Sequence, residues 1–109
     1  YAQPADWGVA EEPMTDETFI HNLEHGGIVI TYRPDLPQDQ IDKLKDLYFK
    51  LPPSSLFNSR KAVVVARPAN ERPISLAAWG YLQHLDNFDE GQIVDFYNSH
   101  LDKGPETAP

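Results

Sequence analysis

Residues 19–32, FIHNLEHGGIVITY, contain a change from one kind of secondary structure to another and two of the four histidines of the chain. Apolar side chains in the first half recur at helical spacing, at Phe19, Ile20 and Leu23. Gly26 stands where a helix commonly ends, and Thr15 or Asp16 can cap its beginning. The β-branched and aromatic run over residues 28–32 is typical of a strand. We therefore predict a short helix from Glu17 that leads through the glycines into a strand.

A second interpretation of the same stretch is a β-hairpin that turns at Gly26 and Gly27. In that case His21 and His25 would lie on one face of a strand instead of one turn apart on a helix. Both structures place the two histidines on the same side of the backbone, but at very different separations.

The remaining sequence alternates helical and strand patterns. We predict helices over residues 37–51 and from Asp89 to the Lys103-Gly104-Pro105 segment, because apolar residues recur there every three or four positions. Residues 62–66, AVVVA, predict a central strand. Residues 74–85 fit either a strand or a helix, and their partial alternation favours a strand with a bulge near Gly80. Residues 1–13 predict an irregular N-terminal arm, held to the domain by Trp7 and Val9.

These elements predict a single domain over residues 1–109, of the α+β class. Its architecture is expected to be a small two-layer domain with the helices packed on a mostly antiparallel sheet. A hydrophobic content of 40 % is enough for a modest core in a chain of this length. Because the chain has no cysteine, disulfides, thiolate metal sites and thiol catalysis are excluded.

The net charge of the chain limits the kinds of partner that it can bind. Seventeen acidic and nine basic residues give a formal net charge of −8, which repels a nucleic-acid backbone and an anionic membrane surface. No apolar run approaches the roughly 18 residues needed to span a bilayer, so we expect no membrane insertion by these residues. A cationic ligand agrees with this charge, while the sequence identifies no protein partner.

The chemistry of the chain is concentrated in His21, Glu24 and His25. On a helix, the two histidines share one face at positions i and i+4, and Glu24 lies beside them. Imidazole and carboxylate ligands suit Zn(II), Cu(II) or Ni(II) better than Mg or Ca, which prefer oxygen ligands. We therefore predict a transition-metal site, for copper or zinc, with Glu24 as third ligand or as the group that orients a histidine.

Two other functions compete with this prediction. The histidines and Glu24 could form a purely structural hydrogen-bond knot in a non-enzymatic protein-interaction domain. His-x-x-Glu-His is also a zinc-protease pattern, in which the Glu acts as general base. Those enzymes place the pattern on a long helix, whereas Gly26 and Gly27 end this helix at once, so the sequence favours a non-enzymatic domain.

Four further residues that could have a function are better explained by structural roles. We expect His84 to be packed and hydrogen-bonded locally, although it is the best reserve ligand, and His100 to interact with a helix C-terminus. Met14 is a potential Cu(I) ligand but is more typical of gap-filling core, and Trp79 is expected in the core.

Four segments of the chain stand out: Trp7-Gly8-Val9, residues 21–27 with the following Ile-Val-Ile and Tyr-Arg-Pro, residues 76–80 (LAAWG) and residues 103–106 (KGPE). Together they resemble the bacterial DUF3105 family over nearly the whole chain. The resemblance implies a fold and a motif but no reaction, because the family is named for its unassigned function. It also implies an exported, periplasmic or otherwise extracytoplasmic protein that can be membrane-tethered, and a Gly-Pro-His-Tyr element whose tyrosine corresponds to Tyr1.

Overall fold

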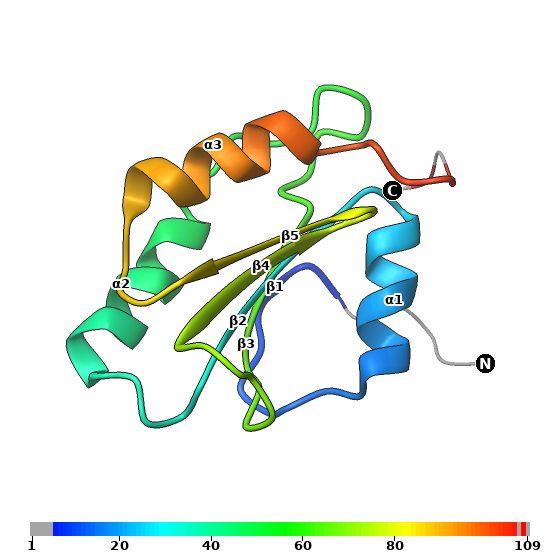
Figure 1. Cartoon of the computed structure of the whole chain (residues 1–109). Coiled ribbons are helices and arrows are strands. Elements are labelled where there is room, and N and C mark those ends of the chain that lie inside the picture. Colours follow the sequence, from blue (N-terminus) through cyan, green and yellow to red (C-terminus); the bar gives the residue numbers. More distant parts are fainter. Residues whose placement is uncertain (1–5, 107, 109) are drawn as a thin grey trace.

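The computed structural model describes residues 6–106 and 108, and its helices and strands alternate along the chain (Figure 1). In chain order they are β1 (Gly8–Val9), α1 (Asp16–Glu24), β2 (Ile28–Tyr32), α2 (Gln38–Tyr48), β3 (Ala62–Ala66), β4 (Ile74–Ala78), β5 (Tyr81–Leu85) and α3 (Glu90–His100). Within the described part, every helix is too short or too polar to cross a bilayer.

The five strands form one mixed sheet in the order β1-β3-β2-β4-β5. The β1–β3 and β3–β2 pairs are parallel, while β2–β4 and β4–β5 are antiparallel and pair slightly more residues. Strands β2 and β3 lie inside the sheet and are covered on both faces, which explains their unbroken apolar sequences. The α+β class and the mostly antiparallel sheet are thus confirmed.

The helices divide between the two faces of the sheet. Helices α2 and α3 cover one face and enclose the larger core, to which β2 and β3 contribute Ile28, Ile30 and Val64. The alternate residues Val29, Val63 and Val65 point to the other face, where Phe19 of α1 packs on them in a smaller core. The large core and its two helices form the expected two layers, and α1 is added on the opposite side (Figure 1).

The helical interpretation of residues 19–25 is confirmed, and the hairpin alternative is wrong. The Thr15 hydroxyl caps α1 by accepting a hydrogen bond from the Thr18 amide at 3.3 Å. Gly26 ends the helix at a φ of +85°, a conformation that glycine adopts without steric cost. The chain then enters β2 in the middle of the sheet.

The structure corrects the prediction for residues 74–85. They form two strands joined by a tight turn at Trp79 and Gly80, with Gly80 at a φ of +80°, and not one bulged strand. Of the two turn residues, Gly80 has the positive φ, at the second position of the turn, where a left-handed conformation favours glycine. Trp79 therefore lies at the tip of a hairpin and is 43 % exposed, so its expected place in the core is wrong.

Two further predictions need adjustment. Part of the N-terminal arm is a short strand, because β1 pairs with β3 at the sheet edge and the Ala10 amide donates to the Val64 carbonyl at 2.9 Å. Residues 1–5 of that arm lie outside the described residues. The last helix ends at His100 rather than near Lys103, because the backbone is extended at Leu101 and has a φ of +59° at Asp102.

Candidate metal centre

His21 and His25 lie one turn apart at the end of α1, as the sequence predicted. Their ring centroids are 4.9 Å apart with the ring planes nearly perpendicular, at 87°. The His21 side chain is buried and the His25 side chain is 17 % exposed. The pair is therefore close enough to share one ligand and is largely shielded from water.

The third member of the group is Glu106, near the C-terminus. The His25 Nε2 and Glu106 Oε2 atoms are 3.6 Å apart, and one potential ligand atom from each of His21, His25 and Glu106 lies within 4.8 Å of the others. Two ligands on a tetrahedral metal, at bond lengths of roughly 2.1 Å, are about 3.4 Å apart. The distance between His25 Nε2 and Glu106 Oε2 is close to that value, whereas ligand atoms as far apart as 4.8 Å would have to move closer together around an ion.

Glu24, the predicted third ligand, is not part of this group of ligand atoms. Its role in the structure is carried by its backbone, because the Glu24 carbonyl accepts a hydrogen bond from the Glu106 amide at 2.9 Å. Glu24 thus holds the segment that brings the Glu106 carboxylate to the histidines. The periodicity of the helix gave no signal for Glu106, although Glu106 ends the Lys-Gly-Pro-Glu element noted in the sequence.

The approach of the C-terminal segment to α1 depends on Gly104. A Cβ atom added to Gly104 would lie 2.4 Å from the Glu24 carbonyl oxygen and 2.6 Å from the Gly26 nitrogen. These are backbone atoms that cannot move aside easily. The Asp102 amide donates to the Gly26 carbonyl at 2.8 Å, two residues before the glycine. The segment therefore docks on the end of α1 only with glycine at this position.

Lys61 links the end of α1 to the C-terminal segment. Its side chain is fully buried, and its ammonium donates to the His25 carbonyl, to Asp102 Oδ1 at 2.8 Å and to the Ala108 carbonyl at 2.7 Å. The ammonium also lies 4.5 Å from the centre of the Phe57 ring. Three acceptors, one of them the Asp102 carboxylate, satisfy this buried cation, as burial requires.

Trp7 packs against Gly27, two residues after His25. A Cβ on Gly27 would come within 2.3 Å of the Trp7 indole, so the glycine makes room for the ring. The Lys61 ammonium lies 5.9 Å from the centre of the same ring. Three segments that stood out in the sequence therefore meet at one place, around Trp7, His21 to Gly27 and Lys103 to Glu106. Figure 1 shows the C-terminal segment beside the end of α1.

The other two histidines lie elsewhere. His84 is exposed on β5, where its Nδ1 is 2.9 Å from the Ser75 hydroxyl, so the expected local hydrogen bond is present but the expected packing is wrong. His100 is in the last turn of α3, as predicted, and stacks on Tyr81 at 4.1 Å between ring centroids. Met14 packs on the smaller core, which agrees with a gap-filling role. Among residues 6–106 and 108, the group of His21, His25 and Glu106 is the one set of three that could hold a metal.

Comparison with known proteins assigns a family. The family model described as "Protein of unknown function (DUF3105)" matches residues 1–109, and the chain therefore belongs to this family. Searches of the curated proteins and of the solved structures give no match. The resemblance seen in the sequence is thus confirmed over the whole chain, and any function has to be argued from the site itself.

Proposed function

We propose that this DUF3105 domain binds a transition metal ion, copper or zinc, through His21, His25 and Glu106. The observation that carries the proposal is the convergence of these three side chains from the two ends of the chain, with their ligand atoms within 4.8 Å of one another. Two imidazoles and one carboxylate are a ligand set that suits Zn(II) and Cu(II). Magnesium and calcium are disfavoured because they prefer all-oxygen sites.

The surroundings of the group support a cation. The chain has a net charge of −8, and the Glu106 carboxylate is half-exposed beside the shielded histidines. The positive charge of Lys61 is balanced by Asp102 at 2.8 Å. An incoming metal ion therefore meets the negative charge of Glu106 without an unbalanced cation next to it.

Binding would connect the end of α1 with the C-terminal segment. Any ligand that binds only the folded chain stabilises it by mass action, so metal binding should raise the unfolding temperature of the domain. The domain would then act as a metal carrier or as a metal-stabilised module. In both roles Glu106 is the ligand that completes the site only after the chain has folded.

The test is calorimetric titration of the purified, metal-free domain with Zn(II) and Cu(II), together with thermal unfolding of each variant. We expect His21→Gln, His25→Asn and Glu106→Gln each to weaken binding by about tenfold or more, which is roughly 1.4 kcal/mol. His100→Ala is the control histidine and Glu24→Gln the control carboxylate, and both should bind metal as the parent does.

Particular results would contradict the proposal. If neither metal binds to the parent domain, the group has no metal function. If His100→Ala weakens binding as much as His21→Gln, the metal binds to the surface without specificity. If Glu24→Gln weakens binding and Glu106→Gln does not, the carboxylate ligand predicted from the helix is the right one.

A structural knot in a protein-interaction domain is the second candidate. The observation that favours it is that backbone hydrogen bonds to the carbonyls of Glu24 and Gly26 already tie the C-terminal segment to α1. The Lys61 ammonium adds a link, because it donates to the His25 carbonyl and also to Asp102. Under this function, substitution of His25 would destabilise the metal-free domain, and added metal would not change its unfolding temperature.

A metallohydrolase is a weaker candidate. Three protein ligands leave a position for water, as in catalytic zinc sites. However, the pocket that lies between α1 and the β4–β5 hairpin is not lined by His21, His25 or Glu106, so a substrate bound there would be away from the ion. Turnover of a peptide library by the zinc-loaded parent, abolished in Glu24→Gln with metal affinity retained, would establish this function instead.

A further inference from the structure

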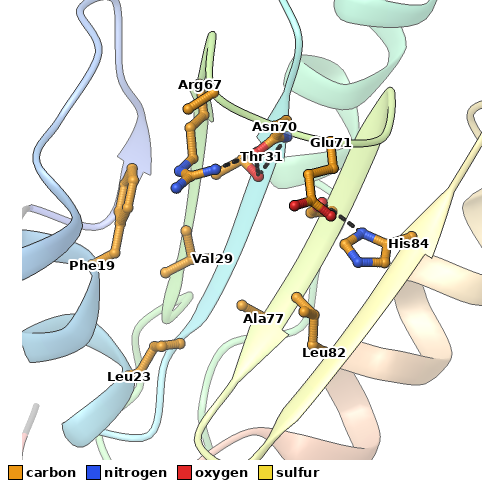
Figure 2. Close-up of a pocket in the computed structure, with 12 residues that line it drawn as sticks. Phe19, Leu23, Val29, Thr31, Arg67, Asn70, Glu71, Ala77, Leu82 and His84 are labelled. Atoms are coloured by element: carbon orange, nitrogen blue, oxygen red, sulfur yellow. Dashed lines mark hydrogen bonds between the residues drawn. The ribbon is translucent and has the colours of Figure 1, made fainter.

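A pocket of about 400 Å³ lies on the α1 side of the sheet, between α1 and the β4–β5 hairpin (Figure 2). Its volume falls within the roughly 300–1,000 Å³ typical of small-molecule sites. None of the three proposed metal ligands lines this pocket, so it is a separate feature of the domain.

The floor of the pocket is apolar. Side chains of α1, the sheet and the hairpin contribute to it, namely Phe19, Leu23, Val29, Ala77 and Leu82 (Figure 2). Ala77 is small where its neighbours are large, which leaves space above the middle of the sheet. An apolar group of moderate size can therefore be buried there, with a gain of roughly 25 cal/mol for each Å² removed from water.

One polar wall of the pocket is internally satisfied. Asn70 is buried, its amide donates to the Thr31 hydroxyl at 2.9 Å, and its carbonyl accepts from Arg67 Nη1 at 3.2 Å. Arg67 also donates to both carboxylate oxygens of Asp16, at 3.1 and 3.0 Å. The hydrogen bond from Arg67 lowers the pKa of Asp16, which keeps this carboxyl ionised and its charge opposite that of Arg67.

The remaining polar groups are Glu71 and His84. Both residues line the pocket, and Figure 2 draws the Glu71 carboxylate next to the His84 ring. Among the described residues, no side chain forms a hydrogen bond or ion pair with the Glu71 carboxylate. His84 is held by Ser75, and in the tautomer that donates Nδ1–H to Ser75 its Nε2 is an acceptor. The hydrogen bond to Asp16 and the charges of Asp16 and Glu71 together raise the pKa of Arg67. One cation thus faces two carboxylates, so the net charge around the pocket is negative.

We propose that this pocket binds a small organic cation, a primary amine on a compact apolar group. The ammonium would donate to the Glu71 carboxylate and to His84 Nε2, and the apolar group would rest on Val29, Ala77 and Leu82. The charge of −8 on the whole chain would attract such a ligand. The proposal is independent of the metal site, which lies on other residues.

Three probes of the same shape and different charge test the proposal: benzylamine, benzyl alcohol and benzoate. Each is titrated into the whole chain with EDTA present, followed by backbone amide NMR shifts. We expect benzylamine to bind at least about tenfold more tightly than either other probe, with the largest shifts at Val29, Ala77 and Leu82. Glu71→Gln should reduce its affinity to that of benzyl alcohol.

Matched variants complete the experiment. Glu11→Gln removes the same charge from an exposed position outside the pocket and should leave benzylamine binding unchanged. Ala77→Leu fills the floor and should weaken all three probes. Tighter binding of benzoate, equal binding of the three probes, an equal effect of Glu11→Gln and Glu71→Gln, or no binding at all would each overturn the proposal. His25→Asn, which tests the metal site, should not affect benzylamine.

Discussion

Single glycines decide how closely distant segments approach one another in this domain. Gly26 and Gly80 both have a positive φ, at +85° and +80°. Their surroundings differ, because a Cβ on Gly26 would lie 2.7 Å from Asp102 Cα, whereas a Cβ on Gly80 would meet nothing within 4 Å. The two positions therefore separate the cost of the backbone conformation from the cost of a steric clash.

We predict that Gly80→Ala lowers the free energy of unfolding by about 1 kcal/mol, the conformational cost of a left-handed residue. Gly26→Ala should cost at least about 2 kcal/mol, because it adds the clash with Asp102. Urea denaturation of both variants measures the difference. Equal losses would mean that the C-terminal segment does not pack on Gly26 as the structure shows.

At the scale of elements, a hydrogen bond from Tyr97 connects α3 with the loop after α2, at Pro52. The ring is fully buried, and its hydroxyl donates to the Pro52 carbonyl at 2.6 Å. Burial raises the pKa of Tyr97 to about 12. The folded protein thus holds this proton up to a higher pH than the unfolded chain, in which tyrosine titrates near 10.

The raised pKa makes the docking of α3 sensitive to high pH. Below about pH 10 both states keep the proton and stability is unaffected, while between about pH 10 and 12 the unfolded state ionises first and stability falls, by about 2 kcal/mol at most. Tyr97→Phe should remove this part of the fall in stability between about pH 10 and 12, because phenylalanine does not ionise. At pH 7 the same variant should lower the free energy of unfolding by about 1 kcal/mol, because the Pro52 carbonyl loses its hydrogen bond. Denaturant unfolding at pH 7, 10 and 11.5 compares the two proteins, and parallel curves at all three values would refute the assignment.

At the scale of the whole molecule, the Lys61–Asp102 pair connects β3, the end of α1 and the C-terminal segment. The Asp102 carboxylate accepts hydrogen bonds from the Lys61 ammonium at 2.8 Å and from the Ser54 hydroxyl at 2.5 Å. Removal of one partner of a buried ion pair leaves the other charge without compensation, which typically costs about 3–5 kcal/mol. The pair is therefore a point on which the docking of the C-terminal segment, and with it the position of Glu106, depends.

We predict that Lys61→Met destabilises the domain by about 3–5 kcal/mol, because the Asp102 carboxylate loses its buried partner and the His25 carbonyl loses a donor. The proposed metal binding should weaken with it. Asn is compatible with the positive φ of Asp102, so Lys61→Met combined with Asp102→Asn should recover part of the lost stability. Lys43→Met, on the exposed side of α2, is the control and should change stability by less than about 0.5 kcal/mol. A double variant no more stable than Lys61→Met alone would show that charge balance is not the cause.

The sequence by itself determined the local structure. The Thr15 cap, the helical spacing up to Leu23 and the glycine at position 26 predict α1, and the β-branched run after it predicts β2, because caps, periodicity and turn residues act over a few neighbouring positions. The same local geometry placed His21 and His25 on one side of a helix. It failed between Ala78 and Tyr81, where a partial alternation did not reveal that Gly80 permits a tight turn.

Only the tertiary structure decided which residues meet at the two proposed sites. Glu106 joins the histidines, rather than Glu24, because Gly104, Lys61 and Asp102 dock the far end of the chain on α1. The pocket beside Glu71 exists because α1 packs on one end of the sheet face and leaves Ala77 uncovered. Such contacts join residues distant in sequence, and their free energy comes from burial and charge pairing, which no local periodicity records.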